Sequence, residues 1–272
     1  MHPVIAFIGG GNMAASLIGG LRAAGRPADS LRVVEISAER CHWLREEFGI
    51  SAGTDAAAAV AGAAAVVLAV KPQQMQDVCS GLRLDPGTVV ISIAAGVRLD
   101  SLQRWLGAGH HFIRCMPNTP ALLQAGITGL YAAAQTSGAA RELAETVLAA
   151  AGACVWVETE TQLDAVTALS GSGPAYFFLL TEVLREAGVA LGLPAATAAQ
   201  LAEQTFIGSA RMAGGDVDVS ELRRRVTSKG GTTEAAVNRL LADGIQPLFT
   251  AALEAAARRG AELGAQLDQP VN

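Results

Sequence analysis

Short apolar segments alternate with helix-forming segments along the first 160 residues of the chain. Each apolar segment has the length of a buried strand, and the stretches between them, such as Ala38–Phe48 and Ala139–Ala151, have helical patterns. Strands that alternate with helices form a mainly parallel sheet with helices on its faces. The strands predicted by this pattern cover Val4–Ile8, Leu31–Ile36, Ala64–Val70, Thr88–Ile93, His111–Cys115 and Cys154–Val157.

Beyond residue 160 the apolar positions show no clear strand pattern, and helical segments follow one another to the end of the chain. The change of pattern predicts two domains, an α/β domain over residues 1–160 and an all-helical domain over residues 161–272. The predicted helices of the second domain cover Gln162–Leu169, Pro174–Leu191, Pro194–Met212, Val219–Val226, Thr232–Ala242 and Ile245–Leu267.

The helix predicted over Pro174–Leu191 carries large apolar side chains around most of its circumference. A helix of this kind has to be covered on every side, and about a hundred residues provide limited cover. We expect a second subunit to cover it. The alternative is a central helix in a monomeric bundle.

Composition excludes several classes of protein. With 51% hydrophobic and 17% charged residues, the chain has the content of a folded domain and not of a disordered one. Its longest weakly polar run, Ala56–Val70, is too short to span a membrane and is interpreted as a helix, a turn and a buried strand. A net charge of −5 provides no basic surface for nucleic acid. The apolar N-terminal segment runs directly into glycines without a signal-peptide pattern, which favours a cytoplasmic protein.

Cysteine and histidine are not arranged as metal ligands. The four cysteines are nearly forty residues apart and form no C-x-x-C pair, so they are interpreted as reduced core residues. His110 and His111 lack an H-E-x-x-H context and are interpreted as surface or core residues. No metal site is predicted. The cysteines are Cys41, Cys79, Cys115 and Cys154.

The segment that follows the first predicted strand has the pattern of a dinucleotide-binding turn. Gly9, Gly10 and Gly11 end the strand, and Asn12 and Met13 open a helix with helix-forming composition. In such a turn the first glycine permits the bend, the second lets the backbone approach a pyrophosphate, and a small residue, here Ala14, packs against the strand. We predict a Rossmann-type cofactor site, with an ordinary glycine turn as the alternative.

Residues at the end of the second predicted strand bear on the choice of cofactor. Glu35 lies where an acid accepts hydrogen bonds from the ribose of NAD. Ser37 and Arg40 could instead hold the 2′-phosphate of NADP. A third interpretation is that all three are ordinary surface residues of a loop.

Three later strand ends carry further candidate cofactor contacts. Ligands of parallel sheets bind beyond the carboxyl ends of the strands, so these loops are expected to form one rim. Each of them could also be an ordinary solvated turn. The candidates are Val70, Lys71 and Pro72, then Ala95 and Gly96, then Asn118 within Met116–Pro120.

Two loops in the helical half are rich in glycine and hydroxyl side chains. Gly171–Pro174 and Thr227–Thr233 each open a predicted helix. Exposed backbone N–H groups at such a helix start suit a small carboxylate, although plain capping by Ser and Thr is the alternative.

Taken together, these motifs resemble the pyrroline-5-carboxylate reductase family, which carries out the last step of proline biosynthesis. The resemblance covers essentially the whole chain, and Lys229 stands where relatives often have Pro. The motifs are the glycine turn with Asn12-Met13, AVKP at 69–72, SIAAGV at 92–97, MPNTPA at 116–121, SGSGPAY at 170–176 and TSKGGTT at 227–233.

The resemblance implies an oxidoreductase that passes a hydride to a cyclic imine. It implies NADPH as cofactor, possible use of NADH, and a homodimer or ring of dimers with the pocket at the dimer interface. It also implies that Thr233 hydrogen-bonds the ring nitrogen and that the nicotinamide reaches the substrate past Asn118. The implied substrate contacts are Ser172 and Gly173 as walls, and Ser228 with the amides of Gly230, Gly231 and Thr232 on the carboxylate.

Two other functions are weighed against this one. A 3-hydroxyacid dehydrogenase also carries a G-x-G loop at a helix start, but it needs a Lys and an Asn where this chain has Phe177 and Leu180. A redox sensor that binds dinucleotide without turnover would lack the two substrate loops.

Overall fold

The computed structural model describes residues 2–267, which form two compact units. The first contains residues up to Ser172 together with those from Ala255 onward, and the second is Gly173–Glu254.

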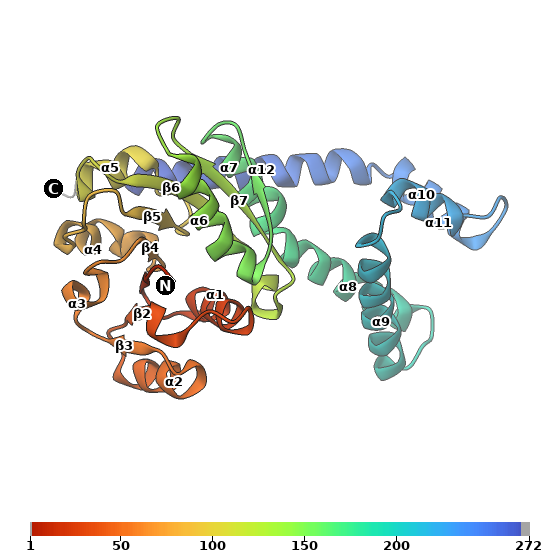
Figure 1. Cartoon of the computed structure of the whole chain (residues 1–272). Helices are drawn as coiled ribbons and strands as arrows, with labels where there is room; N and C mark the ends of the chain where they lie inside the picture. The colour runs from red at the N-terminus through yellow and green to blue at the C-terminus, as the bar shows by residue number, and fades with distance from the viewer. Residues whose placement is uncertain (1, 268–272) are drawn as a thin grey trace. The chain divides into compact units, whose positions relative to one another are not determined.

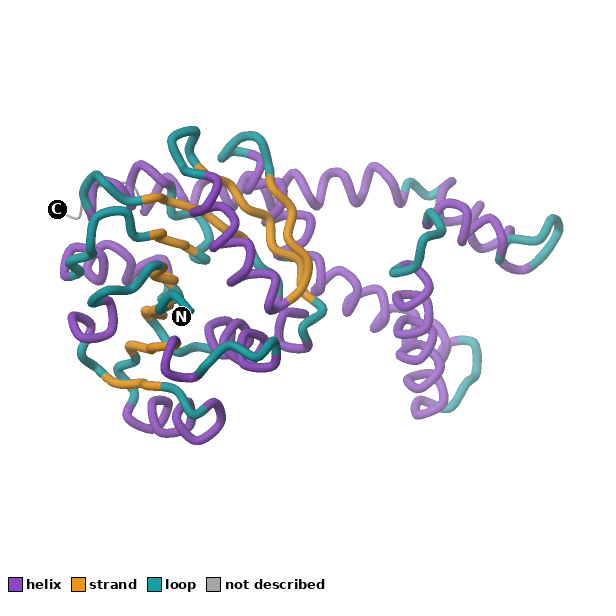
Figure 2. Tube along the Cα trace, viewed as in Figure 1, coloured by secondary structure: helices purple, strands orange, loops and turns teal. Residues whose placement is uncertain are grey.

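The first unit is built on one eight-stranded sheet (Figures 1 and 2). The strand order is β3-β2-β1-β4-β5-β6-β7-β8, and every neighbouring pair is parallel except β6 with β7. The predicted Rossmann-type fold is therefore confirmed. The strands are β1 (Ile5–Ile8), β2 (Leu31–Val34), β3 (Ser51–Gly53), β4 (Ala65–Leu68), β5 (Val89–Ser92), β6 (His111–Met116), β7 (Gly126–Ala132) and β8 (Gly152–Trp156).

Helices cover both faces of this sheet and create two separate hydrophobic cores. One core packs side chains of α1, α2 and α6 against one face, and the other packs α3, α4 and α5 against the opposite face. Alternate residues of the central strands supply the two cores, as Ile5 and Phe7 do for the first and Ala6 and Ile8 for the second. These helices are α1 (Asn12–Ala23), α2 (Ala38–Phe48), α3 (Ala56–Val60), α4 (Met75–Gly81), α5 (Leu99–Leu106) and α6 (Gly138–Leu148).

The register of the sheet brings the ends of its central strands to one edge. Ile8 lies opposite Leu68, and Leu68 lies opposite Ser92, so the loops that follow β1, β4 and β5 start side by side. This edge is where an open parallel sheet binds its ligands.

Two strands were not placed by the sequence pattern. β7 contains two glycines within seven residues, which dilute its apolar pattern, and it is the strand that runs antiparallel to β6. β3 has only three small residues. Neither segment forms an apolar run that is clear enough to predict a strand.

The second unit consists of helices joined by loops. It contains α8 (Gly173–Ala190), α9 (Ala195–Ala213), α10 (Val219–Arg225), α11 (Thr232–Ala242) and the first part of α12 (Ile245–Leu267). The helices predicted from Pro174 onward are all present, and α12 spans the predicted range.

The compact units have bounds that differ from the predicted domains 1–160 and 161–272. Residue 160 is followed by α7 (Gln162–Val166) and a π-helical turn (Thr167–Gly171), and α7 packs on β6 and β7 of the sheet. The end of α12 also joins the sheet unit. The division at residue 160 thus remains a prediction about domains, and residues 1 and 268–272 of its outer ends lie outside the described range.

The four cysteines are free; Cys154 is half-buried and the other three are buried. Burial raises the pKa of the Cys79 thiol to about 12 and that of Cys154 to about 11. Burial also raises the pKa of Cys115. Protonated thiols of this kind behave as small apolar groups, so the predicted core position holds for Cys41, Cys79 and Cys115 and not fully for Cys154.

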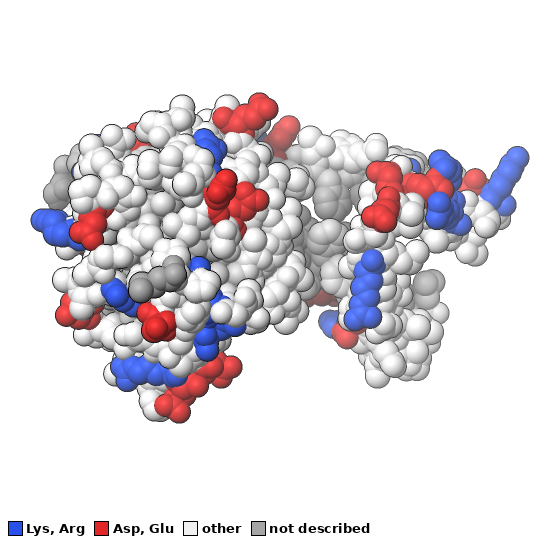
Figure 3. Space-filling model, viewed as in Figure 1, with Lys and Arg blue, Asp and Glu red and all other residues white. Residues whose placement is uncertain are grey.

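Positive and negative side chains are interspersed on the face shown in Figure 3, with no extended basic area. No group of three or more potential metal ligands occurs among the described residues. Within residues 2–267, none of the helices has the length and hydropathy needed to cross a bilayer.

Candidate active site

The three glycines after β1 have different roles. Gly9 has φ +100°, and a Cβ there would lie 2.7 Å from the carbonyl oxygen of Ala69, so only glycine fits. Gly11 has φ −64°, and a Cβ there would meet nothing within 4 Å. The structure therefore needs no glycine at Gly11 for its own packing. Open space beside the backbone at this position is what a dinucleotide pyrophosphate requires.

The start of α1 has backbone donors available for an anion. Gly11 is the N-cap residue and supplies no side-chain cap, and Asn12 in the first turn is exposed. The first N–H groups of a helix lack intrahelical acceptors and carry the positive end of the helix dipole. Met13 instead turns toward the core, where it packs on the cluster beneath α1.

Glu35 and Arg40 hold the Gly10 peptide from both sides. The Gly10 N–H donates to Glu35 Oε2 at 2.9 Å, and Arg40 Nε donates to the Gly10 carbonyl at 2.7 Å. The second oxygen of Glu35 accepts from the Ser37 N–H at 2.9 Å, and the Ser37 hydroxyl caps α2 by accepting from the Arg40 N–H. The Arg40 guanidinium lies 4.0 Å from the centre of the Trp43 ring. All three side chains have structural partners, and these contacts favour neither NADH nor NADPH.

A cavity of about 410 Å³ lies beside the glycine turn. It brings together the predicted residues Gly9, Gly11, Val70 and Lys71 with Glu35. Gly10, Asn12, Met13, Ser37, Arg40 and Asn118 do not line it. The remaining lining residues are Ile8, Val34, Ile36, Ala56, Ala69, Gln74, Val78, Gly81 and Leu82.

A second cavity, of about 350 Å³, contains the other predicted loop residues Pro72, Ala95 and Gly96. Gly96 has φ +81°, and a Cβ there would lie 3.2 Å from the backbone of Gly264 at the end of α12. The loop after β5 and the end of α12 thus approach each other closely at these two glycines. The lining is completed by Gln73, Asp164, Thr167, Gly260, Leu263, Gln266 and Leu267.

Asn118 lies at the end of the predicted rim, but its side chain has a structural partner. Its Oδ1 accepts a hydrogen bond of 2.9 Å from the Ile127 N–H. This bond fastens the loop after β6 to the start of β7. Any contact of Asn118 with a cofactor therefore stays a prediction.

The SGSG segment forms the end of the π-helical turn and the start of α8. The Ser172 N–H donates to the Thr167 carbonyl at 2.9 Å, which continues the helical path, and Gly173 is buried at the first position of α8. A Cβ on Gly171 would lie 2.6 Å from the Met116 side chain, so this turn packs closely on the end of β6. π-Helical turns are often found at functional sites.

The loop before α11 presents fewer free donors than expected. The Gly230 N–H donates to Glu234 Oε2 at 2.7 Å, and the Gly231 N–H donates to the Ser228 carbonyl at 3.0 Å. Within the described range, the N–H groups of Thr232 and Thr233 and the Thr233 hydroxyl have no hydrogen-bond partner. Two of the three amides predicted to bind a carboxylate are thus already bonded.

Sequence reasoning found part of the lining of each cavity and missed the rest. Ala56 and Val78 are apolar residues of α3 and α4, and Leu82 follows the end of α4; all three line the cavity beside the glycine turn. Asp164 is separated from the other rim loops by more than forty residues and belongs to none of the sequence motifs. Only the fold brings these residues to the site.

Comparison with known proteins agrees with the resemblance found in the sequence. Residues 160–263 match the family "Pyrroline-5-carboxylate reductase dimerisation", and residues 4–96 match "NADP oxidoreductase coenzyme F420-dependent". A pyrroline-5-carboxylate reductase of Pseudomonas aeruginosa is 53% identical over 98% of this chain and 99% of its own length.

Solved structures give the same result. A pyrroline-5-carboxylate reductase from Coxiella burnetii superposes with a TM-score of 0.92 at 40% identity, covering 98% of this chain and 99% of that one. A pyrroline carboxylate reductase from Plasmodium falciparum, solved with NADP bound, shares the fold with a TM-score of 0.80 at 24% identity, covering 97% and 98%. On this evidence the chain belongs to the pyrroline-5-carboxylate reductase family.

Proposed function

We propose that this protein reduces 1-pyrroline-5-carboxylate to L-proline with NADPH, the last step of proline biosynthesis. The observation that carries the proposal is the 53% identity to a pyrroline-5-carboxylate reductase along nearly the whole chain. The glycine turn fits the cofactor, because Gly11 leaves open space beside the free N–H groups of α1. NADPH is preferred from the family resemblance, with NADH as the alternative. The substrate and product are small molecules. The cytoplasmic location remains a prediction from the sequence.

The substrate carboxylate is proposed to bind at the start of α11. The N–H groups of Thr232 and Thr233 are available there and lie at the positive end of the helix dipole. The Gly230 amide donates to Glu234 Oε2, so it would bind the substrate only in exchange for that carboxylate. The predicted contacts of Ser228 and Gly231, and the walls formed by Ser172 and Gly173, belong to the same proposal.

The chemistry requires little more than orientation. When bound, the reduced nicotinamide supplies a hydride that forms the new C–H bond at the imine carbon, while a proton adds to the ring nitrogen. The Thr233 hydroxyl would hydrogen-bond that nitrogen and relay the proton. An unperturbed hydroxyl is a poor acid, so its main contribution is to fix the ring in a reactive geometry.

A direct assay tests the proposed function. Purified protein is mixed with pyrroline-5-carboxylate and either NADPH or NADH, and the absorbance of the reduced cofactor is followed. We expect oxidation of NADPH and formation of proline. Absence of turnover with both cofactors would contradict the proposal and favour a sensor that binds dinucleotide without reacting.

Thr233→Ala is expected to lower kcat roughly tenfold to a hundredfold, because the ring nitrogen loses the group that orients it. Affinity for NADPH should be unchanged, since the substitution lies outside the sheet unit that holds the glycine turn. Steady-state kinetics and calorimetric titration of NADPH measure the two quantities. Thr233→Ser, which retains the hydroxyl, is the matched control and should keep most of the activity.

Glu234→Gln is expected to lower KM for the substrate about fourfold, the effect of removing one like charge some 5 Å from the incoming carboxylate in water. The glutamine can still accept the hydrogen bond from the Gly230 amide, so the loop should keep its conformation. The effect should shrink as salt is added. An unchanged KM at low salt would mean that the Glu234 charge does not face the bound carboxylate.

We also propose a homodimer as the functional unit, which could assemble further into a ring of dimers. The second half of the chain matches a dimerisation family over residues 160–263. Gly173 is the only buried residue of α8, and large apolar side chains along that helix are exposed in the single chain. These exposed side chains favour a partner subunit over a monomeric bundle.

A further inference from the structure

Arg114 is a buried cation held between two acids. Its side chain is 5% exposed and lies on β6, two residues before the strand ends at Met116. One terminal nitrogen lies 3.3 Å from Glu160 Oε1 and the other lies 3.3 Å from Asp164 Oδ1. The planar guanidinium group can bind both acids at once, which a lysine ammonium group on a flexible stem would do less well.

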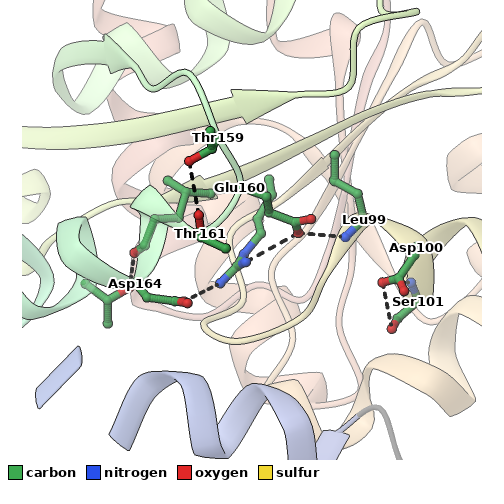
Figure 4. A network of polar contacts seen from close by, with 10 residues as sticks. Leu99, Asp100, Ser101, Thr159, Glu160, Thr161 and Asp164 are labelled. Carbon is green, nitrogen blue, oxygen red and sulfur yellow. Dashed lines mark hydrogen bonds and ion pairs between the residues drawn. The ribbon is translucent and has the colours of Figure 1, made fainter. Parts of the chain in front are cut away.

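Glu160 connects this cluster to the loop that contains Ala95 and Gly96. Its Oε1 accepts a hydrogen bond of 2.9 Å from the N–H of Leu99, the first residue of α5 (Figure 4). The N-cap residue of α5, Arg98, provides no side-chain cap, so Glu160 satisfies an N–H group that the helix itself leaves unpaired. The end of the loop after β5 is therefore fixed by an acid 61 residues away in sequence.

Asp164 connects the cluster to the second cavity and to the SGSG turn. It lines that cavity together with Ala95 and Gly96. It also lies on α7, which continues through the π-helical turn to Gly171, and Gly171 packs on Met116. Through two ion pairs, Arg114 thus joins the end of β6, the start of α5 and the turn that precedes α8.

We propose that Arg114 is a positioning residue, which through Glu160 and Asp164 holds the Ala95–Gly96 and Met116–Asn118 loops in the geometry needed for hydride transfer. The proposal rests on the proposed reductase function. The glycine turn, which would bind the pyrophosphate, lies at a different strand end and makes none of these contacts. The cluster should therefore affect the nicotinamide half of the cofactor and leave the adenosine half unchanged.

If Arg114 only stabilised the fold, kcat would recover together with the unfolding midpoint once all three charges are removed. Buried ion pairs contribute little to stability compared with neutral groups of similar size, whereas removing one partner leaves a charge buried without compensation. Arg114→Met leaves both acids without their cation, and the triple variant Arg114→Met/Glu160→Gln/Asp164→Asn removes all three charges. Comparing the two variants separates loss of stability from loss of geometry.

The experiment measures kcat with NADPH and pyrroline-5-carboxylate, the unfolding midpoint, and binding of 2′-phospho-ADP-ribose, a fragment that lacks nicotinamide. Arg114→Met should lower kcat about a hundredfold, the effect of a misplacement near 1 Å. Affinity for the fragment should change by less than about twofold, as expected for an independent site. The triple variant should regain most of the wild-type unfolding midpoint while kcat stays low.

Arg26→Met is the matched control, because Arg26 is also buried in the sheet unit but donates to the Pro3 carbonyl and contacts no rim loop. It should lower the unfolding midpoint and keep kcat.

Three results would overturn the positioning role. They are recovery of kcat in the triple variant, equal loss of fragment binding in Arg114→Met, and equal loss of kcat in Arg26→Met. An inactive wild type would overturn the proposed function and this proposal with it. An active wild type with an unaffected Arg114→Met variant would overturn this proposal alone.

Discussion

Gly11→Val is expected to abolish cofactor binding while leaving the protein folded. A side chain at Gly11 would enter space that no atom of the chain occupies within 4 Å, and the residue already has φ −64°. The free energy of unfolding should therefore fall by only about 1 kcal/mol, which is the effect of a β-branched residue at an N-cap. A bound pyrophosphate would be displaced from the amides of α1, at a loss of roughly a hundredfold to ten-thousandfold in affinity if two charged hydrogen bonds are lost.

Calorimetric titration of NADPH and thermal unfolding of the cofactor-free protein check the two halves of this prediction. Gly9→Ala is the matched control. A Cβ at Gly9 would lie 2.7 Å from the Ala69 carbonyl oxygen at φ +100°, so this smaller substitution should destabilise the protein by about 1–3 kcal/mol. NADPH affinity close to that of wild type in Gly11→Val would show that the dinucleotide does not approach this turn.

The strands next to the glycine turn were predicted from the sequence, and two other strands of the sheet were not. The glycine pattern at residues 9–11 and the strand-length runs around it predicted the parallel sheet, because both depend on local sequence. The strands that were missed, β3 and β7, are short or glycine-containing, and no local pattern distinguishes such segments from loops. Antiparallel pairing of β7 with β6 likewise depends on the rest of the sheet.

The site was less predictable than the fold for a physical reason. A motif identifies groups that can bind a ligand, but it cannot show which of them the protein itself already uses. The amide of Gly10 is bonded to Glu35, and the amide of Gly230 is bonded to Glu234. Nor could the Arg114 cluster be found from sequence, because its members lie on β6, on α7 and in the loop between β8 and α7.

Leu184→Asp is expected to convert the proposed homodimer into monomers and to remove most of its activity. Leu184 is 58% exposed in the single chain, and Phe178 and Leu179 on the same helix are similarly exposed. Substitution of an exposed residue changes the stability of a monomer by about 0.5 kcal/mol or less. In a dimer that buries α8, each subunit would instead place an unpaired carboxylate in an apolar contact, which costs several kcal/mol.

Analytical ultracentrifugation and the proline-forming assay measure both consequences. Activity should fall by more than about tenfold at concentrations where the variant is monomeric, because the family resemblance implies a pocket shared between subunits. Ala139→Asp adds the same charge to an exposed position at the start of α6, where the helix dipole favours an acid, so it should leave assembly and activity unchanged. A Leu184→Asp variant with wild-type size would show that α8 makes no subunit contact, and its exposed apolar side chains would then need another explanation.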